Sequence, residues 1–433
     1  MLSSYPTLNR RHFLQHVAGF SAGMALPGMQ FLQQLRAAAP TLKKENKSLI
    51  ILWMGGGPST IDLWDLKPGS PNGGEFKPIK TTADGIEISE HLPTVASQFK
   101  HLSVIRSLVT NEGDHNRGTI LMNTGRPPSP VVSYPHIGAV ASSQLTPKEL
   151  DLPGFISVGG TGERIGPGFL GMMYAPFTVQ NPGQPPANIR PPNELGSGDL
   201  ATERIRRRQR LLYTLEDNFI NAKSGEAAQS HSDIYTKAFS LIVSPRGKVF
   251  DFSGEKQSLI DEYGNNQFGR GCLLARRLAE AGVTCIEVDL GGWDNHNGIF
   301  PILRNQRLPV LDKGMGTLVK DLVDRGMWEN TVLVWMGEFG RTPRINQNAG
   351  RDHWARCWSV VVGGGAIKGG IAVGATDKDG TSVADRPVSI KELFATIYRG
   401  LGLDPKTQIR DNLGRPLGIA DDASKAEPIK ELV

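Results

Sequence analysis

Three short segments in the second half of the chain combine acidic and imidazole side chains with glycine. They are Gly291-Gly-Trp-Asp-Asn-His296, Gly337-Glu-Phe-Gly-Arg341 and Gly350-Arg-Asp-His-Trp354. Carboxylate oxygens and imidazole nitrogens grouped in this way suit a divalent metal, with zinc or manganese the best matches. The candidate metal ligands are Asp294, His296, Glu338 and His353.

The first two segments directly follow apolar runs that are typical of buried β-strands, Val283–Leu290 and Thr331–Met336. In an open α/β sheet, the loops at the carboxyl ends of the strands form the ligand crevice. We therefore expect the polar side chains that follow these strands to meet at one edge of the sheet.

A fourth polar group precedes an apolar helical pattern, in Asp114-His-Asn-Arg-Gly-Thr119. His115 could act as a ligand or as a general acid or base, and Arg117 could bind an oxyanion through both of its outer nitrogens. Arg341 supplies a second cation that could stabilise developing negative charge. An alternative is a plain junction between loop and helix, in which Asp and Asn cap the helix.

The turn Gly55–Thr60 also ends an apolar run, and its backbone N–H groups could bind an anion. It lacks the lysine of a nucleotide-binding P-loop, because Ile61 follows Thr60. A plain tight turn explains the same glycines equally well.

Apolar runs alternate with helical patterns along the rest of the chain, which predicts a mainly parallel sheet with helices on both faces. Further strands are expected at Leu49–Met54, Leu102–Arg106 and Trp358–Val362, and helices at Gly269–Ala281, Leu303–Arg325 and Ser389–Gly402. Residues 176–199 are rich in Pro, Gly and Asn and are expected to form a long surface loop. No linker divides the chain, so residues 41–433 are expected to form a single domain.

The 433 residues carry a formal net charge of only +5. Part of it comes from five arginines between Arg204 and Arg210, which we interpret as the solvated face of a helix because apolar residues continue at helical spacing. We therefore expect no nucleic-acid partner. Cys272, Cys285 and Cys357 are odd in number and lie in apolar patterns, so we expect buried free thiols.

Residues 1–40 have the features of an export signal. Asn9-Arg10-Arg11-His12-Phe13-Leu14 is similar to the twin-arginine motif, and a weakly apolar stretch follows it. Glycines and Pro27 interrupt that stretch, so no stable transmembrane span is expected once the signal is removed. These features predict a protein exported in the folded state to the periplasm or beyond, whereas an amphipathic N-terminal helix is the alternative.

The chain resembles the DUF1501 family, which consists of exported bacterial proteins. The resemblance runs from about Leu49 to about Gly418, and it is carried by the three segments above together with Val373-Gly-Ala-Thr-Asp377 and Asp385-Arg-Pro-Val388. The family is similar to the alkaline phosphatase-like superfamily of sulfatases and phosphatases. This resemblance implies a three-layer α/β/α sandwich with a metal site at the carboxyl edge of the sheet.

Two departures from that superfamily bear on the chemistry. The pair of aspartates that normally ends the first strand is replaced by Gly55-Gly56. The segment that corresponds to the sulfatase motif Cys-x-Pro-x-Arg begins at His115 and has no Cys or Ser at the nucleophile position. Because formylglycine is made from a Cys or Ser in that motif, the sequence argues against formylglycine sulfatase chemistry.

Two functions remain open from the sequence. The first is metal-dependent hydrolysis of phosphate or sulfate esters or related oxyanions, either small molecules or polysaccharides, with His115, Arg117 and Arg341 in catalytic roles. The second is an exported protein without catalysis that keeps the fold and binds a polysaccharide or an envelope partner. The loss of the first-strand aspartates favours the second function.

Overall fold

The computed structural model describes residues 46–159, 165–186, 189, 198–221 and 225–433. The export segment predicted for residues 1–40 lies outside the described residues. Asn46–Val433 form one compact unit. Among the described helices, none has both the length and the apolar character that crossing a bilayer requires.

A nine-stranded sheet forms the centre of this unit, in the order β12-β4-β11-β8-β1-β7-β5-β6, with β15 also paired to β4. Its strands are β1 (Ser48–Trp53), β4 (Leu102–Val109), β5 (Phe155–Val158), β6 (Phe177–Val179), β7 (Cys285–Asp289), β8 (Thr331–Met336), β11 (Trp358–Gly363), β12 (Ala372–Val373) and β15 (Val388–Ser389). The pairs along β8-β1-β7-β5-β6 are all parallel. Among the strands that the structure describes in this sheet, only β11 is antiparallel to its neighbours, which are β4 and β8.

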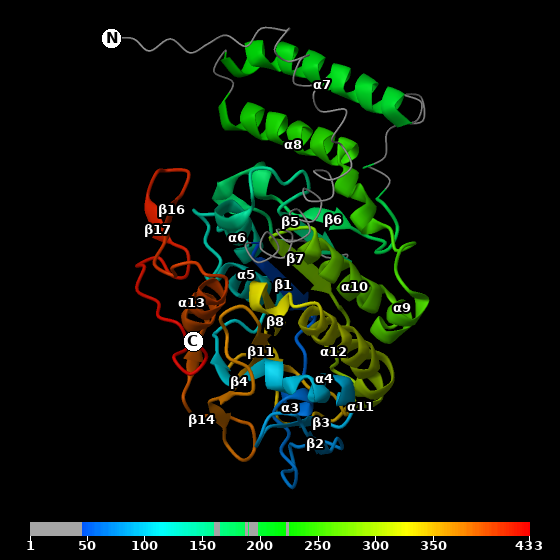
Figure 1. The fold of residues 1–433 in the computed structure, drawn as a ribbon. Helices are drawn as coiled ribbons and strands as arrows, with labels where there is room; N and C mark the ends of the chain where they lie inside the picture. The colour runs from blue at the N-terminus through cyan, green and yellow to red at the C-terminus, as the bar shows by residue number, and fades with distance from the viewer. Residues whose placement is uncertain (1–45, 160–164, 187–188, 190–197, 222–224) are drawn as a thin grey trace, which may run out of the picture. The chain divides into compact units, whose positions relative to one another are not determined.

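The helices lie on both faces of the sheet. They are α3 (Thr60–Leu63), α4 (Pro93–Ser97), α5 (His115–Thr124), α6 (Ile137–Leu145), α7 (Gly198–Asn221), α8 (Gly225–Val243), α9 (Gln257–Tyr263), α10 (Gln267–Glu280), α11 (Ile299–Ile302), α12 (Leu308–Asp324) and α13 (Ile390–Gly400). Helices α10 and α12 cover one face, and α6 and α13 cover the other (Figure 1). The three-layer α/β/α arrangement expected from the sequence is confirmed.

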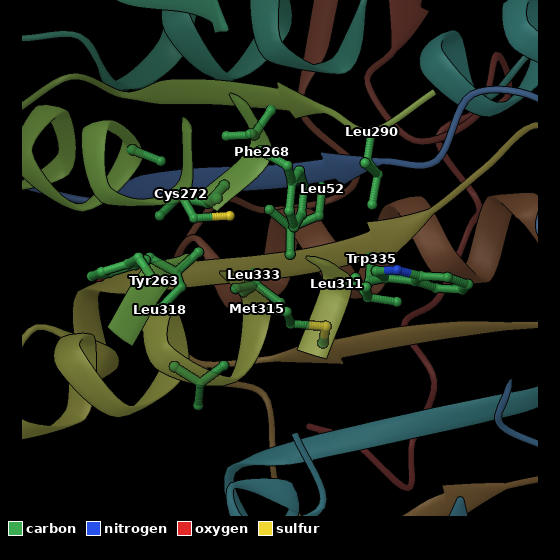
Figure 2. Packing of buried hydrophobic residues seen from close by; sticks show 14 of the residues in the cluster. Leu52, Tyr263, Phe268, Cys272, Leu290, Leu311, Met315, Leu318, Leu333 and Trp335 are labelled. Carbon is green, nitrogen blue, oxygen red and sulfur yellow. The ribbon is translucent and has the colours of Figure 1, made fainter. Parts of the chain in front are cut away.

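Successive side chains of β1 point alternately into two hydrophobic cores, one on each face of the sheet. Ile50, Leu52 and Met54 pack in the core under α10 and α12, and the intervening residues from Leu49 to Trp53 pack in the core under α6 and α13. Figure 2 shows the first core, where Leu52 and Leu333 of the sheet meet Cys272 of α10 and Met315 of α12. Because both faces are covered, the strand is apolar throughout, which is typical of a central parallel strand.

Small two-stranded ladders lie outside the main sheet. They pair β2 (Pro78–Lys80) with β3 (Glu87–Ser89), β9 (Gly340–Arg341) with β10 (His353–Trp354), β13 (Ala375–Thr376) with β14 (Val383–Asp385), and β16 (Gln408–Arg410) with β17 (Pro416–Gly418). The β9–β10 ladder bears on the candidate site, because it sets Arg341 directly opposite His353.

Most predicted elements are confirmed, with differences at three places. The helix expected at 303–325 begins as a π-helical turn, Leu303–Arg307, before α12. The region expected as a loop at 176–199 contains the edge strand β6, which pairs with β5, and part of that region lies outside the described residues. The predicted strand at 358–362 is present as β11 but runs antiparallel.

The arginine-rich segment forms helix α7, and its arginines are exposed as expected. Ser389 and Glu392 form the capping box that the sequence indicates at the start of α13. The three cysteines are buried and unpaired, as predicted.

Candidate metal centre

The loops that leave β1, β4, β7 and β8 all begin at one edge of the sheet. The ends of the central strands are level there, because Trp53 of β1 is in register with Asp289 of β7 and with Met336 of β8. The antiparallel direction of β11 brings the segment before that strand, which contains His353, to the same edge. His115 is the first residue of α5, and the side chain of Asp114 caps this helix by accepting a hydrogen bond from the Arg117 N–H.

The carboxylate of Asp294 is the centre of a cluster of imidazoles. Its Oδ1 lies 3.4 Å from Nε2 of His115, 3.3 Å from Nε2 of His353 and 2.9 Å from Nε2 of His296. The ligand atoms of His115, Asp294 and His353 all lie within 4.8 Å of one another. His296 stands at the side of this group, with its ring centroid 5.0 Å from that of His353.

The other ring nitrogen of each histidine faces a hydrogen-bond acceptor. Nδ1 of His115 lies 2.7 Å from Oε1 of Glu338, and Nδ1 of His353 lies 2.8 Å from the carbonyl oxygen of Gly113. Nδ1 of His296 lies 2.7 Å from Oδ1 of Asp352. A carbonyl or carboxylate oxygen can only accept, so each Nδ1 carries the proton. In the neutral rings, the Nε2 lone pairs of His115 and His353 are then available for binding, whereas that of His296 also lies 3.4 Å from the donor Nη1 of Arg341.

This arrangement fits a cation. Three lone pairs directed at one carboxylate oxygen repel each other unless protons or a metal ion lie among them, and Nε2 of His115 is buried without a hydrogen-bond partner in the described structure. Histidines that bind metals commonly donate their second N–H to a carboxylate or a carbonyl, which holds the tautomer and the ring orientation. The donor set of imidazole nitrogens and a carboxylate oxygen matches zinc or manganese.

Glu338 lies behind His115 and is almost fully buried. Its Oε1 accepts from Nδ1 of His115 and also from the backbone N–H of Gly56, at 2.8 Å. The N–H that could have bound an external anion at this glycine turn is therefore occupied by the protein itself. A side chain at Gly56 is excluded as well, because its φ is +113° and a Cβ there would lie 2.5 Å from the backbone nitrogen of Asp294.

Arg341 is buried and connects the loops of the cluster. Its guanidinium donates to Oδ1 of Asp294 at 2.5 Å, to the carbonyl of Gly57 at 2.8 Å and to the carbonyl of Gly56. Nη1 donates to the carbonyl of Arg351 at 3.2 Å and lies 3.4 Å from Nε2 of His296. Arg341 thus lies at the expected edge of the sheet, with its donors directed at protein oxygens and at Nε2 of His296.

Charge in the cluster favours an ionised Asp294. Burial opposes its ionisation, but the hydrogen bond and the charge of Arg341, followed by the hydrogen bond of His353, lower the pKa of Asp294 to about 2. The hydrogen bond to Glu338 raises the pKa of His115, against the opposing effect of burial. Burial lowers the pKa of Arg341, although a guanidinium remains charged under all ordinary conditions.

Arg117, which was predicted to clamp an oxyanion, is paired with an acidic side chain of the protein. Its side chain is 55% exposed, and its guanidinium binds both oxygens of Glu112, at 2.6 and 2.7 Å. As the third residue of α5, Arg117 projects in a different direction from His115, because successive side chains are spaced around a helix.

Two partners of the cluster did not emerge from the sequence. Asp352 fixes the ring of His296, and the Gly113 carbonyl fixes the ring of His353. Asp352 could have been found, since it stands next to His353 in an acidic and imidazole-rich segment. The carbonyl of Gly113 has no sequence signature, because every residue carries one.

Residues 46–433 match the profile of DUF1501, described as a protein of unknown function. The chain belongs to the DUF1501 family. A comparison with curated proteins finds no match.

Three solved structures have distant similarity to this DUF1501 chain. The lipoteichoic acid synthase LtaP from Listeria monocytogenes is 8% identical, with 88% of this chain and 76% of that chain covered and a TM-score of 0.36. The PsFucS1 sulfatase from Pseudoalteromonas sp. is 12% identical, with coverage of 87% and 72% and a TM-score of 0.34. A protein in the alkaline phosphatase superfamily from Vibrio parahaemolyticus is 12% identical, with coverage of 83% and 67% and a TM-score of 0.35.

Proposed function

We propose that this chain is a metal-dependent hydrolase of phosphate or sulfate esters or related oxyanions. The observation that carries the proposal is the common orientation of three histidines. Each one donates its Nδ1–H to a protein oxygen and directs Nε2 at the carboxylate of Asp294. This arrangement is expected of a metal centre, in which the second N–H of each ligating histidine is held by a protein oxygen.

In this proposal His115, Asp294 and His353 hold one divalent ion, zinc or manganese, and His296 is a fourth donor at its side. A bound ion of this kind supplies Lewis acidity toward an ester oxygen. The buried Glu338 orients His115 and is not itself a ligand. His115 then acts as a ligand and not as the base that starts the attack, because Nδ1 is already bound to Glu338 and Nε2 faces the ion.

Nothing in the cluster supports formylglycine chemistry. Cys272, Cys285 and Cys357 are all buried, and burial raises the pKa of each thiol. We expect the intact mass of the purified protein to show no conversion of cysteine to an aldehyde.

A second candidate function is an exported protein that binds an anionic polysaccharide or an envelope partner without turnover. The specific observation in its favour is the placement of the two arginines expected to stabilise charge. Arg117 is paired with Glu112 away from the cluster, and Arg341 is buried and donates to protein oxygens. Neither guanidinium has a donor directed at solvent beside the metal site.

One experiment separates the two candidates. The purified protein is loaded with zinc or with manganese and assayed with p-nitrophenyl phosphate, p-nitrophenyl sulfate and sulfated oligosaccharides. A hydrolase gives turnover that a chelator abolishes and that the Asp294→Ala variant lacks. Bound metal together with saturable oligosaccharide binding, but without turnover, would favour the second candidate.

A further inference from the structure

A buried ion pair stands beside the candidate metal centre. Asp62 of α3 and Arg351 both have side chains that are fully excluded from solvent. The guanidinium binds both carboxylate oxygens, with Nε 2.8 Å from Oδ2 and Nη2 2.8 Å from Oδ1. Paired contacts of this kind fix the plane of the guanidinium as well as its position.

The remaining donors of Arg351 are also used. Nη1 donates to the carbonyl of Thr342 at 3.1 Å and to the carbonyl of Pro343, and Nη2 donates to the carbonyl of Asn72 at 2.9 Å. All five N–H groups of the guanidinium therefore have acceptors. The side chain ties the segment before His353 to α3 and to the loop at Asn72.

The backbone of Arg351 connects this anchor to the cluster. Its N–H donates to the carbonyl of Asn295 at 3.1 Å, between Asp294 and His296. Its carbonyl accepts from Nη1 of Arg341 at 3.2 Å. The next two residues are Asp352, which holds Nδ1 of His296, and His353, whose Nε2 faces Asp294.

Stability alone does not explain such a pair. Removing two charges from water is costly, and buried ion pairs can often be replaced by apolar residues of similar volume without loss of stability. An apolar pair could fill the same space but could not orient the backbone around it. The five N–H donors of a guanidinium lie in a rigid plane and therefore determine where each bound carbonyl lies.

We propose that the Asp62–Arg351 pair is a positioning clamp that sets the loop carrying Asp352 and His353 at the geometry required for metal binding. The inference rests on the metal site proposed above, and it assigns the pair no contact with metal or substrate. Its consequence is that metal affinity depends on the pair more strongly than folding does.

The test compares three variants with the unmodified protein. The double variant D62N/R351M removes both charges without leaving either one unpaired, and R351K keeps the charge but not the five planar donors. The matched control is R276M, which removes another buried arginine. After this substitution Glu255 still pairs with Arg277, and Asp321 still pairs with Arg325. Each of the two carboxylates therefore keeps a cationic partner.

Each protein is stripped of metal and titrated with Co²⁺, and the affinity, the visible spectrum and the melting temperature of the metal-free form are measured. The proposal predicts that D62N/R351M and R351K bind Co²⁺ about 10–100-fold more weakly, as is usual when support behind a ligand is lost. Their bound Co²⁺ should also show an altered spectrum. R276M should melt at a lower temperature yet keep the affinity and spectrum of the unmodified protein.

Two results would overturn the clamp, and they are distinguishable. If D62N/R351M or R351K is folded and binds Co²⁺ with unchanged affinity and spectrum, the clamp is wrong while the metal site stands. If the unmodified protein binds neither Co²⁺ nor Zn²⁺, the metal site itself is absent and the pair has no metal-binding loop to position. Should the double variant fail to fold, R351K decides the question, since it leaves Asp62 paired.

Discussion

At the scale of the residue, the two nitrogens of each imidazole have different surroundings. In His115 one nitrogen contacts the buried carboxylate of Glu338, and the other is buried and faces Asp294 without a partner. A ring that served only to pack against Phe339, whose centroid lies 5.0 Å away, would not need both contacts. Ligand chemistry accounts for both of them.

The substitution His115→Ala removes a proposed ligand and should lower zinc affinity by more than the roughly 10–100-fold that loss of an outer contact produces. Isothermal titration of the metal-free protein measures this. Arg117→Ala is the matched control on the same helix, because that side chain is exposed and paired with Glu112. Equal losses in the two variants would show that the effect comes from the helix and not from the ligand.

Glu338→Gln tests the outer contact itself. Glutamine keeps the size of the side chain and can still accept from the Gly56 N–H. It no longer presents a negatively charged oxygen to the Nδ1–H of His115. We expect zinc affinity to fall by about 10–100-fold with the fold retained. A drop as large as that of His115→Ala would instead indicate that Glu338 binds the metal directly, as the sequence alone had suggested.

At the scale of the element, much of the fold was accessible from the sequence. Apolar runs identified the central strands β1, β7 and β8, because strands buried on both faces leave a continuous pattern. The capping box at Ser389 marked the start of α13 for the same kind of local reason. The edge strand β6 was not predicted, because three residues within a region rich in Pro and Gly are too few to show the apolar pattern of a strand.

The direction of β11 illustrates what local pattern cannot give. The run 358–362 identifies a strand but not its neighbours, and only its pairing with β4 and β8 makes it antiparallel. That direction places His353 at the same sheet edge as Asp294. Similarly, residue types pointed to Asp294, His296, Glu338 and His353, but the assignment of Glu338 behind His115 required the distances between them.

Helix α5 can approach the cluster because Gly118 has no side chain. A Cβ at this position would lie 3.0 Å from the carbonyl oxygen of Glu338 and 3.1 Å from the ring of Phe339. Gly118→Ala should therefore displace the start of α5 and His115 with it, because overpacking against a backbone carbonyl, about 1–3 kcal/mol, should outweigh the gain of about 1 kcal/mol in helix propensity. Denaturant melts and zinc titration measure the two effects.

Gly291→Ala serves as the control for that variant. It lies in the loop that carries Asp294, and a Cβ there would meet nothing within 4 Å. We expect Gly291→Ala to keep both stability and zinc affinity. If Gly118→Ala behaves in the same way, helix α5 does not set the position of His115.

At the scale of the whole molecule, the proposed metal centre and the proposed export route fit together. The twin-arginine pathway carries folded proteins, and a metal bound before export would remain with the fold. The prediction concerns residues 1–40, which lie outside the described residues. Changing Arg10 and Arg11 to Lys should leave the precursor in the cytoplasm, as cell fractionation and immunoblotting would show. Undiminished export of that variant would exclude the twin-arginine route.

If His115, Asp294 and His353 hold a divalent metal, the protein should carry it when isolated. Elemental analysis of the protein purified from its native host without added metal tests this, alongside the His353→Ala variant prepared in the same way. We expect about one equivalent of zinc or manganese per chain in the unmodified protein, and a large loss in the variant with unchanged circular dichroism. A folded, unmodified protein that contains no metal and takes up neither ion on dialysis would contradict it.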